Sequence, residues 1–273
     1  MPAMIIKLFL SLFVLMSLTT PTVGLEPPKN GGVYVIAHRG AHDGIPENTL
    51  AAYRKAIELG VDFVEIDVRT TKDGQLVSIH NRTIDAYTDG DKQGKVADLT
   101  LAELKALDIG SRVDARWKGE RVPTLDEILK LCQGKIGIYL DPKNASVEAV
   151  VERIRAYGMQ QQVVWCISPA QVAELRQSCP QCVPMPDPES EEGLVEMIVK
   201  TQAEVVAPVW SDFSETFSDK SHSAGALVFV DERESDPANW SLALEWGADG
   251  IQTDDPAGLI DFLKRREAYR KKR

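Results

Sequence analysis

The sequence predicts an α/β fold, a single (β/α)8 barrel of the TIM type. Short, almost wholly apolar runs are typical of parallel strands buried on both faces, and here they alternate with amphipathic helical segments. The alternation fills nearly all of the 273 residues, close to the length of about 250 residues that one such barrel needs. A doubly wound open sheet is the alternative, but no Gly-x-Gly-x-x-Gly segment follows an early strand.

Nine segments have the composition of strands, one more than an eight-stranded barrel holds. One of them is therefore expected to be short or to lie outside the barrel. The link between Val68 and Gln75 is too short for a crossover helix, and it contains the turn-forming run TKDG. The nine segments are Val33–Ala37, Phe63–Val68, Leu76–Ile79, Ile136–Leu140, Val163–Ile167, Val183–Met185, Val205–Ala207, Ala226–Val230 and Asp249–Gln252.

Segments with helical periodicity lie between these strands. The first, Thr49–Leu59, follows Asn48, which is a favourable N-cap residue, and stops at Gly60. The other predicted helices are Thr100–Leu107, Leu125–Leu131, Val147–Tyr157, Pro169–Ser178, Gly193–Thr201, Asn239–Trp246 and Ala257–Arg265.

The chain is acidic, with a formal net charge of −10 and a pI near 5.0. A field of one sign repels nucleic acid and anionic membranes. The charge therefore argues against a nucleic-acid partner and gives no support for membrane contact.

The N-terminal residues have the pattern of a secretory signal peptide. Lys7 supplies the positive start, Leu8–Leu18 is an apolar run too short to span a membrane, and Gly24 is a small residue at a cleavable position. We therefore expect a signal peptide over residues 1–24, a barrel domain over residues 25–273, and a secreted or periplasmic location. Export would permit a disulfide between Cys179 and Cys182, although two plain thiols fit the sequence equally well.

Two of the four histidines occupy matching positions. His38 ends the run VYVIAH and His80 ends the run LVSIH. Active sites in these barrels lie at the carboxyl ends of the strands, so both imidazoles are expected at the same open end. Imidazole gains and loses a proton near neutral pH, and two facing rings form an acid/base pair. Either histidine alone is more simply a structural side chain.

Acidic residues also follow the predicted strands. Glu65 and Asp67 are two apart and so share one face of a strand, and Asp141 ends another strand with Lys143 two residues later. Two carboxylates inside a barrel repel each other unless a divalent cation binds them, and oxygen ligands suit Mg²⁺ or Ca²⁺. A glycosidase carboxylate pair is one alternative, but it does not explain the two histidines. An ion pair of Glu65 with a nearby arginine or lysine is the other.

A cationic side chain completes the set. Arg39 follows His38 directly, and a guanidinium at this end of the barrel suits a phosphate anion. Glu47 is placed either to hold Arg39 or a histidine, or to interact with the N-terminus of the next helix. A cation, a metal and two proton carriers together indicate phosphoryl transfer.

The order of several motifs points to a known family. They are AHRG at 37–40, PENT at 46–49, VEIDV at 64–68, TKDG at 71–74, VSIH at 77–80, LTLAELKALDIG at 99–110, VPTLDEIL at 122–129 and GADGIQTDDP at 247–256. With them the chain resembles the glycerophosphodiester phosphodiesterase family. The resemblance implies a (β/α)8 barrel and metal-dependent hydrolysis of a small glycerophosphodiester to glycerol 3-phosphate and an alcohol.

The resemblance also implies roles for the residues above. It implies one divalent cation, Mg²⁺ or Ca²⁺, bound by three carboxylates, with two histidines as the acid/base pair and basic residues on the phosphate. The implied acid/base pair is His38 and His80, the metal ligands are Glu65, Asp67 and Asp141, and the substrate contacts are Arg39, Lys143 and Glu47.

Three positions depart from the family pattern. Asn81 stands where an aspartate usually follows the second histidine, and Asp141 stands where a glutamate is usual. The segment VFVDE at 228–232 lacks the usual tryptophan. These departures bear on metal affinity and on the choice of alcohol, and they leave both histidines in place.

Two other functions fit the sequence less well. A lipid-directed phospholipase C or D on a similar barrel needs an apolar rim, for which WSDFSETF at 210–217 is the candidate. A non-catalytic phosphodiester-binding protein would be expected to have lost a histidine or a carboxylate, and all are present.

Overall fold

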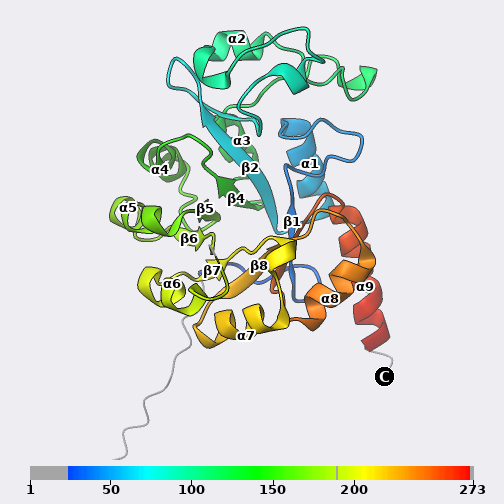
Figure 1. Cartoon of the computed structure of the whole chain (residues 1–273). Coiled ribbons are helices and arrows are strands. Elements are labelled where there is room, and N and C mark those ends of the chain that lie inside the picture. Colours follow the sequence, from blue (N-terminus) through cyan, green and yellow to red (C-terminus); the bar gives the residue numbers. More distant parts are fainter. Residues whose placement is uncertain (1–23, 189, 271–273) are drawn as a thin grey trace, which may run out of the picture.

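The computed structural model describes residues 24–188 and 190–270 (Figure 1). The predicted signal peptide therefore lies outside the described residues, except for Gly24. In the part of the chain that is described, no helix is both long enough and apolar enough to cross a membrane.

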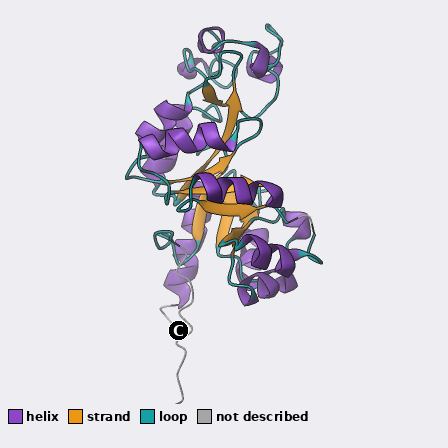
Figure 2. Cartoon of the chain, turned by 90° about the vertical axis from the view of Figure 1, so that its left-hand side faces the viewer, coloured by secondary structure: helices purple, strands orange, loops and turns teal. Residues whose placement is uncertain are grey.

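Eight parallel strands form a barrel surrounded by helices, as predicted, and the open-sheet alternative is wrong (Figures 1 and 2). The hydrogen-bonded order is β6-β5-β4-β2-β1-β9-β8-β7, and β6 packs against β7 to complete the ring. The barrel strands are β1 (Tyr34–Ala37), β2 (Phe63–Thr70), β4 (Gly137–Asp141), β5 (Val163–Ile167), β6 (Val183–Pro186), β7 (Val205–Val206), β8 (Leu227–Asp231) and β9 (Gly250–Thr253).

Each barrel strand is followed by a helix that packs on the outside of the ring. The outer helices are α1 (Leu50–Leu59), α3 (Leu125–Cys132), α4 (Val147–Ala156), α5 (Val172–Ser178), α6 (Leu194–Thr201), α7 (Glu215–Ser223), α8 (Pro237–Glu245) and α9 (Pro256–Arg270). Helix α7 is not among the predicted helices. Its sequence, ETFSDKSHS, is mostly polar, and the residues it buries are Phe217, Ser218 and Ser221. Two small serines on the buried face leave almost no apolar periodicity to detect.

The ninth predicted strand, β3 (Leu76–Ser78), lies outside the barrel. It pairs antiparallel with the outer half of β2, and TKDG forms the turn between them with Gly74 at φ 76°. The expectation of one strand outside the barrel is confirmed. The segment from this hairpin to α3, which includes α2 (Leu101–Lys105), forms a lobe beside the barrel with its own small core (Figure 1).

The apolar core has two layers, as strands with buried faces require. One layer lies between the strands and the helices, and a second fills the barrel, where Tyr34, Phe63 and Phe229 have ring centroids 5.1 to 5.8 Å apart. Cys179 and Cys182 are joined by a disulfide at the amino end of β6, so the local bridge is the correct reading.

Candidate active site

Side-chain alternation carries functional groups to the carboxyl ends of the strands. Successive strand residues point to opposite sides, so every second residue faces the barrel interior. Ile36 belongs to the interior core, and the next inward position along the chain is His38. Phe63 is also interior, and the following inward positions are Glu65 and Asp67. The inward-facing positions of β1 and β2 are therefore apolar at first, and at the carboxyl ends of these strands they carry an imidazole and two carboxylates.

Asp67 and Asp141 are register partners on neighbouring strands, and Lys143 contacts both of them. Asp67 is 1% exposed, and the Lys143 ammonium lies 3.1 Å from its Oδ1 and forms a close ion pair with Asp141. Burial raises the pKa of Asp141, although the charge of Lys143 opposes the rise. The ammonium thus offsets part of the repulsion between the two carboxylates.

Glu65 is a buried acid whose surroundings oppose its ionisation. Its side chain is 4% exposed, and one carboxylate oxygen accepts the backbone N–H of Arg39 at 2.8 Å. Burial, with the negative charge of Asp67 added, raises the pKa of Glu65 well above its usual value. Ionising this carboxyl group is unfavourable unless additional positive charge is supplied nearby.

Arg39 occupies a tight turn directly after β1. Its φ is 54°, in the left-handed region that most residues avoid, and Gly40 follows at φ 88°. A Cβ on Gly40 would lie 2.8 Å from the Cβ of Ala52, so only glycine fits against α1. The turn directs the Arg39 guanidinium to Glu47, 3.2 Å away, and brings its Nε within 3.7 Å of Asp67.

Asn48 holds Asp67 from the other side. Its amide nitrogen donates to Asp67 Oδ2 at 2.8 Å. Its amide oxygen accepts the hydroxyls of Tyr53 and Ser78, each at 2.8 Å, and all of these groups are buried. The prediction that Asn48 caps α1 is wrong, because Thr49 is the N-cap. Asn48 instead fixes the orientation of a carboxylate.

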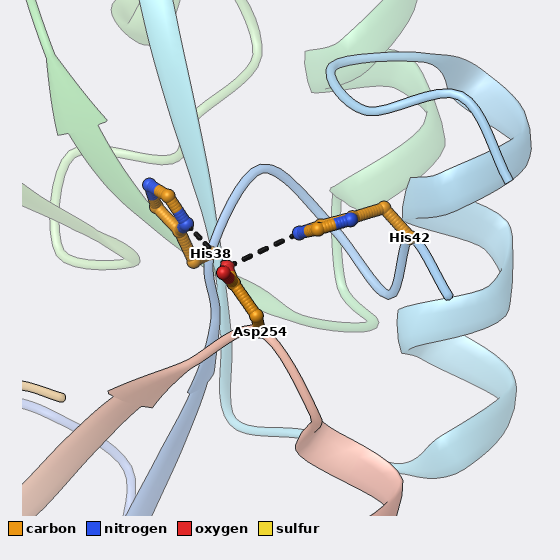
Figure 3. Close-up of side chains that lie close together, drawn as sticks. All are labelled: His38, His42 and Asp254. Carbon is orange, nitrogen blue, oxygen red and sulfur yellow. Dashed lines mark hydrogen bonds and ion pairs between the residues drawn. The ribbon is translucent and has the colours of Figure 1, made fainter. Parts of the chain in front are cut away.

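His38 and His42 share one carboxylate, that of Asp254 (Figure 3). His38 Nδ1 lies 2.6 Å and His42 Nε2 lies 3.2 Å from the same Asp254 oxygen. Burial alone would raise the pKa of Asp254, but the contacts with the two imidazoles outweigh it and hold the pKa far below its usual value. Asp254 is therefore anionic at neutral pH, and it favours the His38 tautomer that carries its proton on Nδ1.

His80 reaches the site by a different route from the one predicted. It does not end a barrel strand, because β3 is antiparallel and lies outside the barrel. The hairpin runs back toward the barrel, and the N–H of Ile79 donates to the carbonyl of Asp67 at 2.9 Å. This contact places His80 at the level of Asp67 and near Asp141, whose pKa a positive charge on His80 would lower. His80 Nδ1 lies 2.9 Å from Asn81 Oδ1.

Two residues of this site had no assigned role in the sequence analysis, His42 and Asp254. Asp254 lies in the run TDDP, between β9, which ends at Thr253, and α9, which begins at Pro256. The sequence pattern alone gave no role to the side chain of Asp254. It follows a barrel strand just as His38 does, and that signal identifies it.

Two groups of side chains have the chemistry to hold a metal ion. Glu65, Asp67 and Asp141 offer carboxylate oxygens, two of them on nearly inaccessible residues, and Asp67 Oδ1 lacks a hydrogen bond of good geometry. This donor set fits a hard divalent cation, which would relieve the repulsion among the three acids. Within residues 24–188 and 190–270, one group has all its ligand atoms within 4.8 Å of one another, and that group is His38, His42 and Asp254.

The chain matches known proteins along nearly its whole folded length. Residues 38–258 match the model of the glycerophosphoryl diester phosphodiesterase family. A glycerophosphodiester phosphodiesterase of Caldanaerobacter subterraneus subsp. tengcongensis is 33% identical over 255 residues, which is 85% of this chain and 98% of that protein. One of Bacillus subtilis is 35% identical over 155 residues, 51% of each chain.

Solved structures agree with the sequence matches. A glycerophosphodiester phosphodiesterase from Agrobacterium tumefaciens superposes with a TM-score of 0.75 at 27% identity, over 84% of this chain and 99% of that one. The fold is also that of an Oleispira antarctica phosphodiesterase in complex with the product sn-glycerol-3-phosphate, with a TM-score of 0.75 at 24% identity over 85% and 96% of the two chains. With a matching barrel, a family match from His38 to residue 258 and a full-length relative, the chain belongs to the glycerophosphoryl diester phosphodiesterase family.

Proposed function

We propose that this protein hydrolyses small glycerophosphodiesters to glycerol 3-phosphate and an alcohol with the help of a divalent cation. The proposal rests on which side chains lie together at the carboxyl ends of the barrel strands. Glu65, Asp67, Asp141 and Lys143 lie at the carboxyl ends of β2 and β4, with His38 and Arg39 directly after β1, and the Ile79 contact brings His80 to the level of Asp67. The full-length relative of this chain bears that activity in its name. Phosphoryl transfer needs charge neutralisation and two proton transfers, and these residues supply both.

We assign the cation to the carboxylates. Glu65, Asp67 and Asp141 would hold Mg²⁺ or Ca²⁺, and the bound cation would withdraw charge from the phosphate of the substrate. The rival site formed by His38, His42 and Asp254 is already satisfied by two contacts between its own members. Its nitrogen-rich donor set also suits a softer transition metal rather than Mg²⁺ or Ca²⁺.

The two histidines would transfer the protons through their Nε2 atoms. The Nδ1 atom of His38 is hydrogen-bonded to Asp254, and the Nδ1 atom of His80 is hydrogen-bonded to Asn81, so Nε2 of each ring is left for the substrate. We assign His38, which the carboxylate of Asp254 orients, as the base that takes a proton from the attacking oxygen, and His80 as the acid that protonates the leaving alkoxide. Arg39, backed by Glu47, and Lys143 would hold the phosphate oxygens.

The direct test is a panel of glycerophosphodiesters assayed for released glycerol phosphate, with and without a chelator. We expect turnover that a chelator abolishes and that added Mg²⁺ or Ca²⁺ restores. In a companion calorimetric titration, D67N should lose cation binding, whereas H42A should retain it because His42 belongs only to the rival site. Activity that survives chelation, or cation binding lost in H42A and kept in D67N, would contradict the assignment.

Export is a further part of the proposal. The apolar run and small residues near Gly24 support a cleaved signal peptide. The disulfide between Cys179 and Cys182 supports an oxidising location outside the cytosol. N-terminal sequencing of the protein recovered from its host tests this, with Leu25 expected as the first residue.

A further inference from the structure

Tyr87 belongs to the lobe beside the barrel, yet its hydroxyl reaches the site. The residue ends a short 3-10 helix, Asp85–Tyr87, and its ring is packed in the small core of the lobe, where it is 2% exposed. The guanidinium of Arg112 covers the ring, 5.2 Å from its centroid. Burial raises the pKa of Tyr87 to about 12, so the group is a neutral hydroxyl that can both donate and accept.

The hydroxyl lies between two chain segments that carry different functional groups. It accepts the backbone N–H of Asn81 at 3.0 Å, and it lies 3.5 Å from Glu47 Oε1, toward which its own proton is free to point. Asn81 contacts His80 through its side chain, and Glu47 contacts Arg39. One oxygen atom therefore touches the supports of both the second histidine and the phosphate-binding arginine.

Loss of the contact toward Arg39 and loss of the contact toward His80 should change different kinetic constants. Arg39 would contact the phosphate in the bound substrate as well as in the transition state, so a loosened Arg39 raises KM. A displaced His80 impairs only proton transfer, so it lowers kcat. A group that supports both residues is expected to change both constants when it is removed.

We infer that Tyr87 is a positioning residue that fixes His80 and Arg39 relative to each other, so that the proton donor and the phosphate contact are set by the lobe rather than by the barrel alone. The inference rests on the proposed function for its kinetic consequences. It needs no contact between Tyr87 and the substrate. Its structural basis is the pair of contacts made by one buried hydroxyl.

The test is Y87F, which removes only the oxygen, set against variants of each half. We expect E47Q to raise KM with little change in kcat, and N81A to lower kcat with little change in KM. Y87F should do both, with a change of about fivefold in each constant, the size expected for one hydrogen bond. A Y87F variant that changes neither constant, or only one, would overturn the inference. Y157F, in a tyrosine at the end of α4, is the matched control and should change neither.

A second measurement does not depend on turnover. The Asn81 N–H is bonded to Tyr87 in the wild-type protein, so its hydrogen exchange should be slowed. In Y87F, the exchange rate of this amide should rise about tenfold, while that of the Ile79 N–H, which bonds to Asp67, should stay the same. An unchanged Asn81 rate would contradict the inference. A wild-type protein without diesterase activity would instead contradict the proposed function.

Discussion

The two histidines of the site are delivered and supported in opposite ways. His38 follows β1, which pairs in parallel with β2 on one side and with β9 on the other, and the ring is hydrogen-bonded to the anionic Asp254. His80 follows a short antiparallel strand outside the barrel, and its partner is the neutral side chain of Asn81. Two similar sequence endings therefore produce unlike environments, because the strand before each one pairs differently.

The backbones that carry the two histidines are also held to the barrel by different contacts. The backbone N–H of His38 donates to the carbonyl of Thr253 on the neighbouring strand β9, and the N–H of the next residue donates to Glu65. The hairpin that carries His80 is tied to the barrel through the Ile79 contact and through Arg69, which donates to the His80 carbonyl at 2.6 Å. We expect the His38 side to behave as part of the rigid barrel and the His80 side to depend on the lobe.

The largest effect should come from removing either imidazole. H38A and H80A should each lower kcat by about 10²–10⁴-fold, because each loses one proton transfer. The measurement is glycerol phosphate release, with circular dichroism to show that the fold survives. H222A is the matched control, since His222 pairs with Asp249 near the amino end of β9, away from the site. Activity within tenfold of wild type in H38A or H80A would remove that residue from the mechanism.

A smaller effect should separate the two supports. D254N should lower kcat by about 10- to 100-fold, because it removes the charge that fixes the His38 tautomer. N81A should cost less than about tenfold, because a neutral amide holds a ring more weakly than a carboxylate does. D249N, which alters the same kind of pair at His222, should leave kcat unchanged. An N81A defect as large as that of D254N would break the comparison.

The sequence predicted the parts of the site that depend on local periodicity. His38, Glu65, Asp67 and Asp141 follow from period-two alternation at the ends of buried strands, and so does the barrel itself. Asp254 could be placed at the end of a strand but not beside His38, because that contact requires β1 to pair with β9 from the far end of the chain. His80 was expected at the end of a barrel strand, but the structure carries it on the antiparallel hairpin outside the barrel.

Other features depend on tertiary packing that leaves little local signal. Helix α7 buries serines, which do not mark an apolar face. Asn48 and Tyr87 act through side-chain bonds to residues of other elements, Asp67 in one case and Glu47 in the other. Such bonds depend on the angle at which two elements pack, and this angle cannot be predicted from the local sequence.

In the proposed mechanism, the rings of His38 and His80 converge on one phosphate held beside Glu65, Asp67 and Asp141. The most direct measurement is a crystal structure of the protein with Mg²⁺ and glycerol 3-phosphate. We predict that the phosphate contacts Arg39 and lies within hydrogen-bonding reach, about 2.6–3.2 Å, of the Nε2 atoms of both histidines. A bound phosphate that only one of the two rings can reach would rule out the paired roles of His38 and His80.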